Sequence, residues 1–152
     1  MTHELDRILP TILSRCQVVN FALVSEKEMQ SANLSEEVAT LSIGRPGLAQ
    51  LLSADELEKI FRLEARNQFE KVINSSLNER FVLADEYSKD IVKTLEKLNI
   101  WTWEMRKKAL AGSENERLDI FTKIEKIQQT MFVLKRTNAN SKLILETLFM
   151  DM

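Results

Sequence analysis

The sequence predicts an all-α protein in which a unit of three short helices precedes a bundle of about five longer helices. Three observations predict this class. Only three glycines and two prolines occur among 152 residues, far fewer helix breakers than average composition supplies. Apolar residues recur at intervals of three and four over most of the chain, which is the period of a helix that buries one face. Helix-capping residues stand at the start of these stretches, and only short loops separate one stretch from the next. Short loops are typical of antiparallel helices that neighbour each other in a bundle.

The first segment, residues 1–24, does not follow the bundle pattern. Residues 4–16 have helical spacing, but Pro10 lies inside them, so we expect a kink or a new short helix there. Residues 17–23, QVVNFAL, are rich in β-branched and aromatic side chains and predict the one strand of the chain. Because no second strand is predicted to pair with it, we expect residues 17–21 to be disordered or paired with another chain.

Three short helices are predicted over residues 25–32, 35–43 and 46–52. Ser25 and Glu28 form a capping-box pattern at the start of the first helix, and Ser35 is the expected N-cap of the second. Gly44 is expected to end the second helix, and Pro46 suits the first position of the third. Helices this short predict a small unit with a thin core.

The bundle is predicted over residues 54–152. Its helices are expected to begin at capping signals in residues 53–56, 76–79 and 113–116 and at Asn140, with a further helix over about residues 90–111. Trp101 and Trp103 are two positions apart, about 200° around a helix, so one is expected in the core and the other against a neighbouring helix or subunit. The predicted core includes Phe61, Phe69, Leu95, Ile124, Ile127 and Leu148.

Composition limits the functions to consider. The net charge is −2 and the pI is about 5.6, so the strongly basic surface that is typical of direct DNA binding is absent overall. The basic runs at residues 106–108 and 135–136 are short, lie near acidic residues and are interpreted as solvated helix faces. The single cysteine, Cys16, excludes an intrachain disulfide and fits a reducing compartment. With no signal-like start and no apolar run of about 18 residues, we expect a cytoplasmic protein.

No cofactor and no metal site are predicted. His3 and Cys16 are the only histidine and cysteine, and no spacing of carboxylates gathers ligands around them. Glycine-rich phosphate loops are absent, since residues 44–47, GRPG, match neither known pattern. Pairs of carboxylates are unavoidable among 23 acidic residues, and solvated helix faces are the simpler interpretation.

Several stretches match sequence motifs as well as a helical period. Residues 9–17 read LPTILSRCQ, with the triplet Ser14-Arg15-Cys16 at the centre, and residues 41–52 read LSIGRPGLAQLL. Residues 138–149 read NANSKLILETLF, and residues 78–89 read NERFVLADEYSK. The first stretch resembles the SRC motif of clamp-loader subunits in the AAA+ family, and the second resembles the lid segment around sensor 2. The last two are similar to the helical collar of these subunits, and residues 78–89 are closer to the delta-prime type than to gamma/tau.

The resemblance implies a domain organisation and a role. Residues 1–24 would be the C-terminal remnant of an AAA+ ATPase domain, residues 25–53 the lid, and residues 54–152 the collar that joins subunits into a ring. The rest of the sheet would then precede residue 1, so the chain is expected to be an expression fragment or a late-start product. The implied function is that of a non-catalytic accessory subunit of the bacterial sliding-clamp loader of the DNA polymerase III holoenzyme, not an enzyme by itself. Implied partners are the gamma/tau and delta subunits and, indirectly, the sliding clamp and primed DNA, with no membrane.

The resemblance also implies site residues. Arg15 would be an arginine finger that acts on a neighbouring subunit's ATP, with Ser14 and Cys16 holding its loop; we expect Cys16 to be a small buried packing residue rather than a nucleophile. Leu48 stands where nucleotide-binding members have the sensor arginine, while Arg45 comes earlier. This difference favours delta-prime over gamma/tau, although Arg45 could reach a phosphate from its shifted position. Two alternatives remain open: a fragment of the gamma/tau motor subunit, and a helical adaptor unrelated to replication.

Overall fold

The computed structural model describes residues 8–31 and 34–152. Helix makes up 77% of this part of the chain, which contains no strand, so the predicted all-α class is confirmed. None of the helices in it is long and apolar enough to cross a bilayer. The described helices are α1 (Pro10–Leu13), α2 (Glu26–Ser31), α3 (Glu36–Leu41), α4 (Pro46–Ala54), α5 (Glu56–Asn74), α6 (Leu77–Ser88), α7 (Ile91–Ala111), α8 (Glu114–Arg136) and α9 (Ser141–Met150).

Helices α2, α3 and α4 pack into a small unit with its own core, as the sequence predicts. The buried residues of this core are Met29, Val38, Ala39, Leu41, Ala49 and Leu52. The predicted caps form: the Glu28 carboxylate accepts from the Ser25 amide at 3.0 Å, and the Ser35 hydroxyl accepts from the Val38 amide at 3.3 Å. Pro46 occupies the first turn of α4, where its missing N–H leaves no donor unsatisfied.

The turn between α3 and α4 attaches the N-terminal arm, residues 8–24, to this unit. Gly44 has φ +71 and follows Ile43 at φ 56, so both residues are in the left-handed region that favours glycine. The amide of Val24 donates to the Gly44 carbonyl at 2.8 Å. A Cβ at position 44 would lie 2.9 Å from the Val24 carbonyl oxygen. The glycine therefore lets the arm approach the turn closely.

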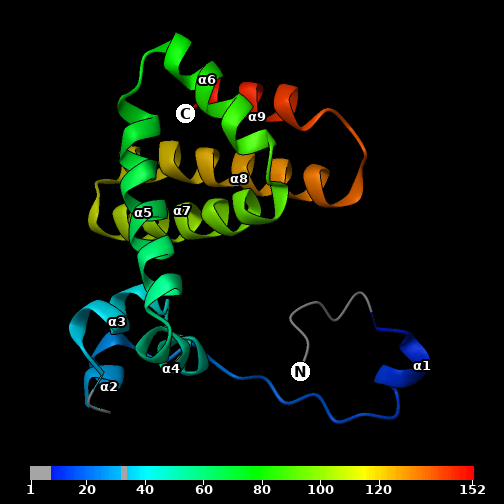
Figure 1. The fold of residues 1–152 in the computed structure, drawn as a ribbon. Coiled ribbons are helices and arrows are strands. Elements are labelled where there is room, and N and C mark those ends of the chain that lie inside the picture. The colour runs from blue at the N-terminus through cyan, green and yellow to red at the C-terminus, as the bar shows by residue number, and fades with distance from the viewer. Residues whose placement is uncertain (1–7, 32–33) are drawn as a thin grey trace.

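Helices α5 to α9 form the bundle (Figure 1). In the view of Figure 1, α7 and α8 run side by side, α6 and α9 pair above them, and α5 crosses α7 and extends down to the small unit. Trp101 is fully buried at the centre, where its ring centroid lies 5.8 Å from Phe69, 5.6 Å from Tyr87 and 5.9 Å from Phe149. Its Nε1–H donates to the Ala65 carbonyl at 2.8 Å, which satisfies the buried indole.

The predicted bundle core is largely confirmed. Phe69, Ile124, Ile127 and Leu148 are buried. Phe61 and Leu95 are only half-buried. The division of the tryptophans is as expected from their spacing, because Trp101 is in the core and Trp103 is half-buried on another side of α7.

One predicted cap is wrong. Ser53 does not start α5, because α4 continues to Ala54 and the Ser53 hydroxyl donates to the Ala49 carbonyl at 2.9 Å within that helix. Asp55 is the N-cap, and its carboxylate accepts from the amides of Leu57 at 3.0 Å and Glu58 at 3.2 Å. An extended backbone and a carboxylate at this position satisfy the first N–H groups of α5.

The strand predicted from the composition of residues 17–23 does not form, which agrees with the expectation that it has nothing to pair with in this chain. Residues 17–24 have no regular secondary structure, although their composition favours a strand. Val18, Val19, Phe21 and Leu23 are 50%, 64%, 78% and 57% exposed. A strand needs a paired neighbour, and no other strand exists in residues 8–31 and 34–152. Pairing of this segment with another chain stays a prediction.

Candidate functional site

The arm presents the Ser14-Arg15-Cys16 triplet directly after α1. Pro10 starts this single turn of helix as predicted, and its carbonyl accepts from the Ser14 amide at 2.9 Å. The Ser14 hydroxyl donates to the Thr11 carbonyl at 3.2 Å, and the Arg15 amide donates to the Ile12 carbonyl at 3.0 Å. Ser14 thus closes α1, and the backbone of Arg15 is held by the end of the helix.

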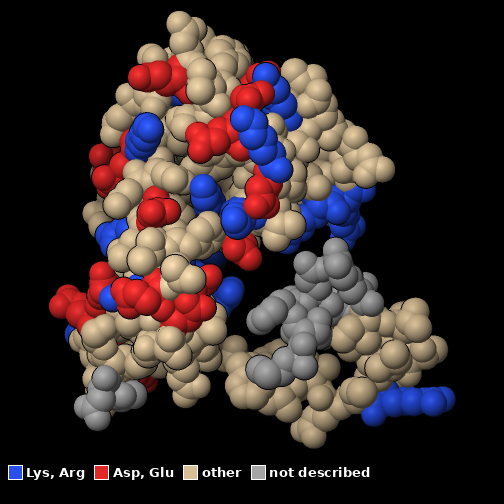
Figure 2. Space-filling model, viewed as in Figure 1, with Lys and Arg blue, Asp and Glu red and all other residues tan. Residues whose placement is uncertain are grey.

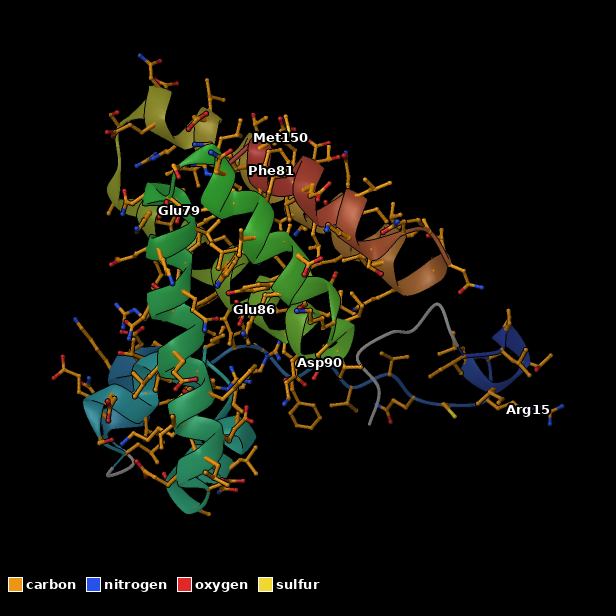
Figure 3. All side chains as sticks on the ribbon, turned by 45° about the horizontal axis from the view of Figure 1, so that its top comes forward. Arg15, Glu79, Phe81, Glu86, Asp90 and Met150 are labelled. Atoms are coloured by element: carbon orange, nitrogen blue, oxygen red, sulfur yellow. The ribbon has the colours of Figure 1, made fainter. Side chains whose placement is uncertain are left out.

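The side chain of Arg15 is exposed. Figure 3 shows it at the outer side of the arm, directed away from the bundle. Its guanidinium makes no ion pair and no hydrogen bond within the described ranges. A guanidinium presents five donors in a planar fork that matches phosphate oxygens, so these donors are available to a group outside the chain.

Cys16 is not a buried packing residue as expected. It is a free, exposed cysteine, although its amide donates to the Leu13 carbonyl at 3.2 Å. Cys16 would be buried only if the Ser14-Arg15-Cys16 motif packed against the rest of a domain. In the structure α1 contributes no buried residue, and the thiol is exposed.

The described residues include no group of three or more His, Cys, Asp or Glu side chains that could hold a metal ion. His3 lies outside the described residues. The lowered pKa values of Glu28, Glu79 and Glu116 come from hydrogen bonds with the serine of each capping box, and that of Asp85 from its hydrogen bond and ion pair with Lys142. Burial raises the pKa of Tyr87. These shifts come from structural contacts rather than from a reactive cluster.

Arg45 lines a hollow between the small unit and the bundle. Arg45 precedes α4 and is exposed, and its amide donates to the Ser42 carbonyl at 3.0 Å. The hollow has a volume of about 750 Å³ and receives side chains from the α3–α4 turn, α5, α7 and α8. Its lining residues of positive charge are Arg45, Arg62, Arg106, Lys135 and Arg136, and its one carboxylate is Glu96. Arg15 and Arg45 therefore belong to separate parts of the molecule.

Sequence reasoning missed this hollow. The interpretation of residues 106–108 and 135–136 as solvated faces rests on the acidic neighbours of each run in sequence. The basic residues that line the hollow come from four separate segments, and their order along the chain has no period or spacing that relates them. Figure 2 shows blue atoms gathered below the right-hand end of the bundle, where α8 ends in Figure 1.

No protein-family model, no curated protein and no solved structure matches this chain. The resemblance to clamp-loader subunits therefore depends on the short motifs alone.

Proposed function

We propose that this chain is the C-terminal part of a clamp-loader accessory subunit of the delta-prime type, which joins a ring of subunits and supplies Arg15 to a neighbouring ATP site. In this proposal residues 1–24 complete an AAA+ ATPase domain, residues 25–53 are the lid and residues 54–152 are the collar. The observation that supports it most directly is the exposed guanidinium of Arg15, without a partner in the described chain, at the end of a helix in the SRC motif.

The proposed chemistry of Arg15 follows from the charge of phosphoryl transfer. Negative charge on the γ-phosphoryl oxygens is redistributed as the bond to the leaving diphosphate breaks, and a guanidinium from the next subunit stabilises that charge. The fork of donors can bind two phosphate oxygens at once, which a lysine ammonium does not reproduce. Ser14 contributes by ending α1 and fixing where Arg15 leaves the helix. The ATP belongs to the neighbour, so the chain is not an enzyme by itself.

The exposed apolar side chains of the arm fit the same proposal. Val19 and Phe21 are 64% and 78% exposed, and a sheet of the ATPase domain would bury them and pair their backbone. The hydrogen bond from Val24 to Gly44 then links that domain to the lid. A change in the arm's position would be transmitted to the lid through this contact.

The bundle surface offers contacts for ring formation. Leu118, Phe121, Phe132 and Leu143 are each more than half exposed, although they lie on helices α8 and α9 of the bundle. Exposed large apolar side chains of this kind suit an interface with another subunit. The proposed partners are the gamma/tau and delta subunits, with the sliding clamp and primed DNA reached through the assembled ring.

The test uses Arg15 variants in the full subunit assembled with its partners. Arg15→Ala is expected to leave assembly unchanged, as measured by sedimentation, and to slow DNA-stimulated ATP turnover at the adjoining site by about 10³-fold or more. Arg15→Lys is expected to restore little of that rate. Phe132→Ala is the contrasting variant, since it should lower turnover only in proportion to the decrease in assembly. Normal assembly with an unchanged rate for Arg15→Ala would refute the arginine-finger role.

A further inference from the structure

The hollow between the lid unit and the bundle concentrates positive charge in a chain that is acidic overall. Five basic residues and one acidic residue line it, whereas the whole chain has 21 basic and 23 acidic residues. A concave surface of one sign focuses the electrostatic field and raises the local concentration of ions of opposite sign. The hollow is therefore suited to an anion.

The positively charged side chains of the hollow differ in how many contacts they make within the protein. Arg62 donates from Nε to Glu58 at 2.9 Å, and Arg136 lies 4.5 Å above the ring of Phe132. Arg45 and Arg106 are exposed, and neither makes an ion pair or a side-chain hydrogen bond in residues 8–31 and 34–152. Two guanidinium groups that line the hollow, one from the α3–α4 turn and one from α7, thus have all their donors available.

Trp103 lines the same hollow and adds a neutral hydrogen-bond donor to it. Its Nε1 is buried and has no hydrogen-bond acceptor in the described part of the chain, and the residue lines the hollow. A buried N–H without an acceptor is unfavourable, so an oxygen-rich ligand would gain from supplying one. The aromatic rings of Trp103 and Phe132 and the amides of Asn99 and Gln128 complete the wall.

We propose that this hollow binds phosphate groups, with Arg45 and Arg106 as the principal ligands and Trp103 as an additional donor. Planar guanidinium forks bind phosphate oxygens in pairs, and two such groups match the several negative charges of linked phosphates better than the single charge of one carboxylate. The volume of about 750 Å³ lies in the usual range for small-ligand sites and accommodates several linked phosphate groups. Two sources supply this chemistry: a free oligophosphate, and the backbone of single-stranded nucleic acid, whose bases would stack on the aromatic residues. Phosphate binding in the hollow does not depend on the arginine-finger role of Arg15.

Binding to the chain of 152 residues tests the proposal. Titration calorimetry with inorganic tripolyphosphate is expected to show saturable binding, which Arg45→Gln/Arg106→Gln weakens by at least about tenfold. Lys27→Gln/Lys71→Gln is the matched control: both lysines are exposed, lie outside the hollow and have no ion pair within the described chain. This control should bind like the unmutated chain. Circular dichroism verifies that each variant is folded.

Two further measurements identify the source of the phosphate and the wall involved. Anisotropy of a short fluorescein-labelled oligothymidylate should show the same dependence on Arg45 and Arg106 if the ligand is nucleic acid, and the slope of log K against log salt should fall by about 0.7 for each phosphate-binding arginine that is replaced. Binding of tripolyphosphate alone identifies a small-anion site. Ligand should also change the fluorescence of the chain, and Trp103→Phe should abolish that change while leaving the buried Trp101 signal. No binding at millimolar ligand, equal weakening by both double variants, or tighter binding of an oligoglutamate than of either phosphate ligand would each overturn the proposal.

Discussion

At the scale of single residues, Arg80 stabilises the junction of three helices. Its guanidinium donates to three backbone carbonyls: Ser75 at 3.1 Å, Ile73 at 2.9 Å and Phe149 at 2.9 Å. These carbonyls lie at the C-terminal ends of α5 and α9, where helices leave carbonyls without an internal partner. One half-buried arginine at the start of α6 thus satisfies acceptors on two other helices.

Replacing Arg80 should therefore destabilise the bundle. Arg80→Ala leaves the three carbonyls without their charged donor and is expected to lower the free energy of unfolding by about 2–3 kcal/mol. Arg80→Lys should recover only part of the loss, because an ammonium cannot reach three carbonyls along the directions of a fork. Urea denaturation followed by circular dichroism measures the difference. Arg66→Ala is the control: Arg66 is half exposed and its single ion pair, with Glu104, is 3.6 Å long, so it should cost less than about 1 kcal/mol.

The placement of some single side chains could be predicted from the sequence, and that of others could not. The spacing of Trp101 and Trp103 predicted correctly that only one of them lies in the core, because helical geometry determines the angle between them. The role of Arg80 could not be predicted, since its acceptor on Phe149 is 69 positions away. The hollow lined by Arg45 and Arg106 could not be predicted for the same reason, because the fold brings together residues that are far apart in the sequence.

At the scale of elements, three helices begin with the same device. Ser25, Ser76 and Ser113 each share hydrogen bonds with a glutamate three residues later. These bonds favour the ionised carboxylate, so the pKa values of Glu28, Glu79 and Glu116 lie below the ordinary value of 4.5. Local patterns of this type were predictable because every partner lies within four residues.

The capping boxes predict an acid-dependent loss of stability. Since the three folded-state pKa values are depressed, their contribution is present above about pH 4.5 and is lost as pH falls through the lower, folded-state values. Thermal unfolding midpoints measured from pH 7 to pH 2 should therefore fall in the acid range. In Glu79→Gln/Glu116→Gln, the midpoint should fall less between pH 5 and pH 2 than in the unmutated chain. An identical acid profile in both proteins would contradict this assignment.

The turn at Gly44 gives a second prediction for an element. Gly44→Ala places a Cβ about 2.9 Å from the Val24 carbonyl oxygen on a backbone with φ +71, so we expect the Val24 to Gly44 hydrogen bond to weaken and the arm to detach from the small unit. Hydrogen exchange of the Val24 amide should become faster, and the thermal midpoint should fall. Gly47→Ala is the matched control: a Cβ there meets nothing within 4 Å in α4, so the substitution should be neutral or stabilising by up to about 1 kcal/mol. Unchanged exchange at Val24 in Gly44→Ala would contradict the attachment.

At the scale of the whole molecule, the helix pattern was predictable, whereas the conformation of residues 17–23 was not determined by their composition. Helix order followed from capping signals and apolar periodicity, because both are local. Residues 17–23 have strand composition, yet a strand exists only when a neighbour pairs with it, and the described chain supplies none. The error at Ser53 has a similar cause, since the choice between Ser53 and Asp55 as cap depends on how far α4 extends.

The two separate cores predict that the bundle can fold without the small unit. Every buried residue of the larger core lies at or after Phe69. The small unit meets the bundle through packing of α3 and α4 on α5 and through two partly exposed ion pairs, Lys59–Glu37 at 2.7 Å and Lys107–Glu26 at 2.6 Å, which solvent screens.

A fragment of residues 54–152 should therefore fold alone, with one cooperative urea transition and a free energy of unfolding lower than in the whole chain. Circular dichroism and urea titration measure both quantities. Residues 75–152 form the control fragment. They lack α5, and with it the buried Phe69 and Val72 and the Ala65 carbonyl that accepts from Trp101, so they should lose the cooperative transition. If residues 54–152 unfold without cooperativity while the whole chain unfolds cooperatively, the small unit is part of the bundle's folding unit and the boundary near residue 54 is wrong.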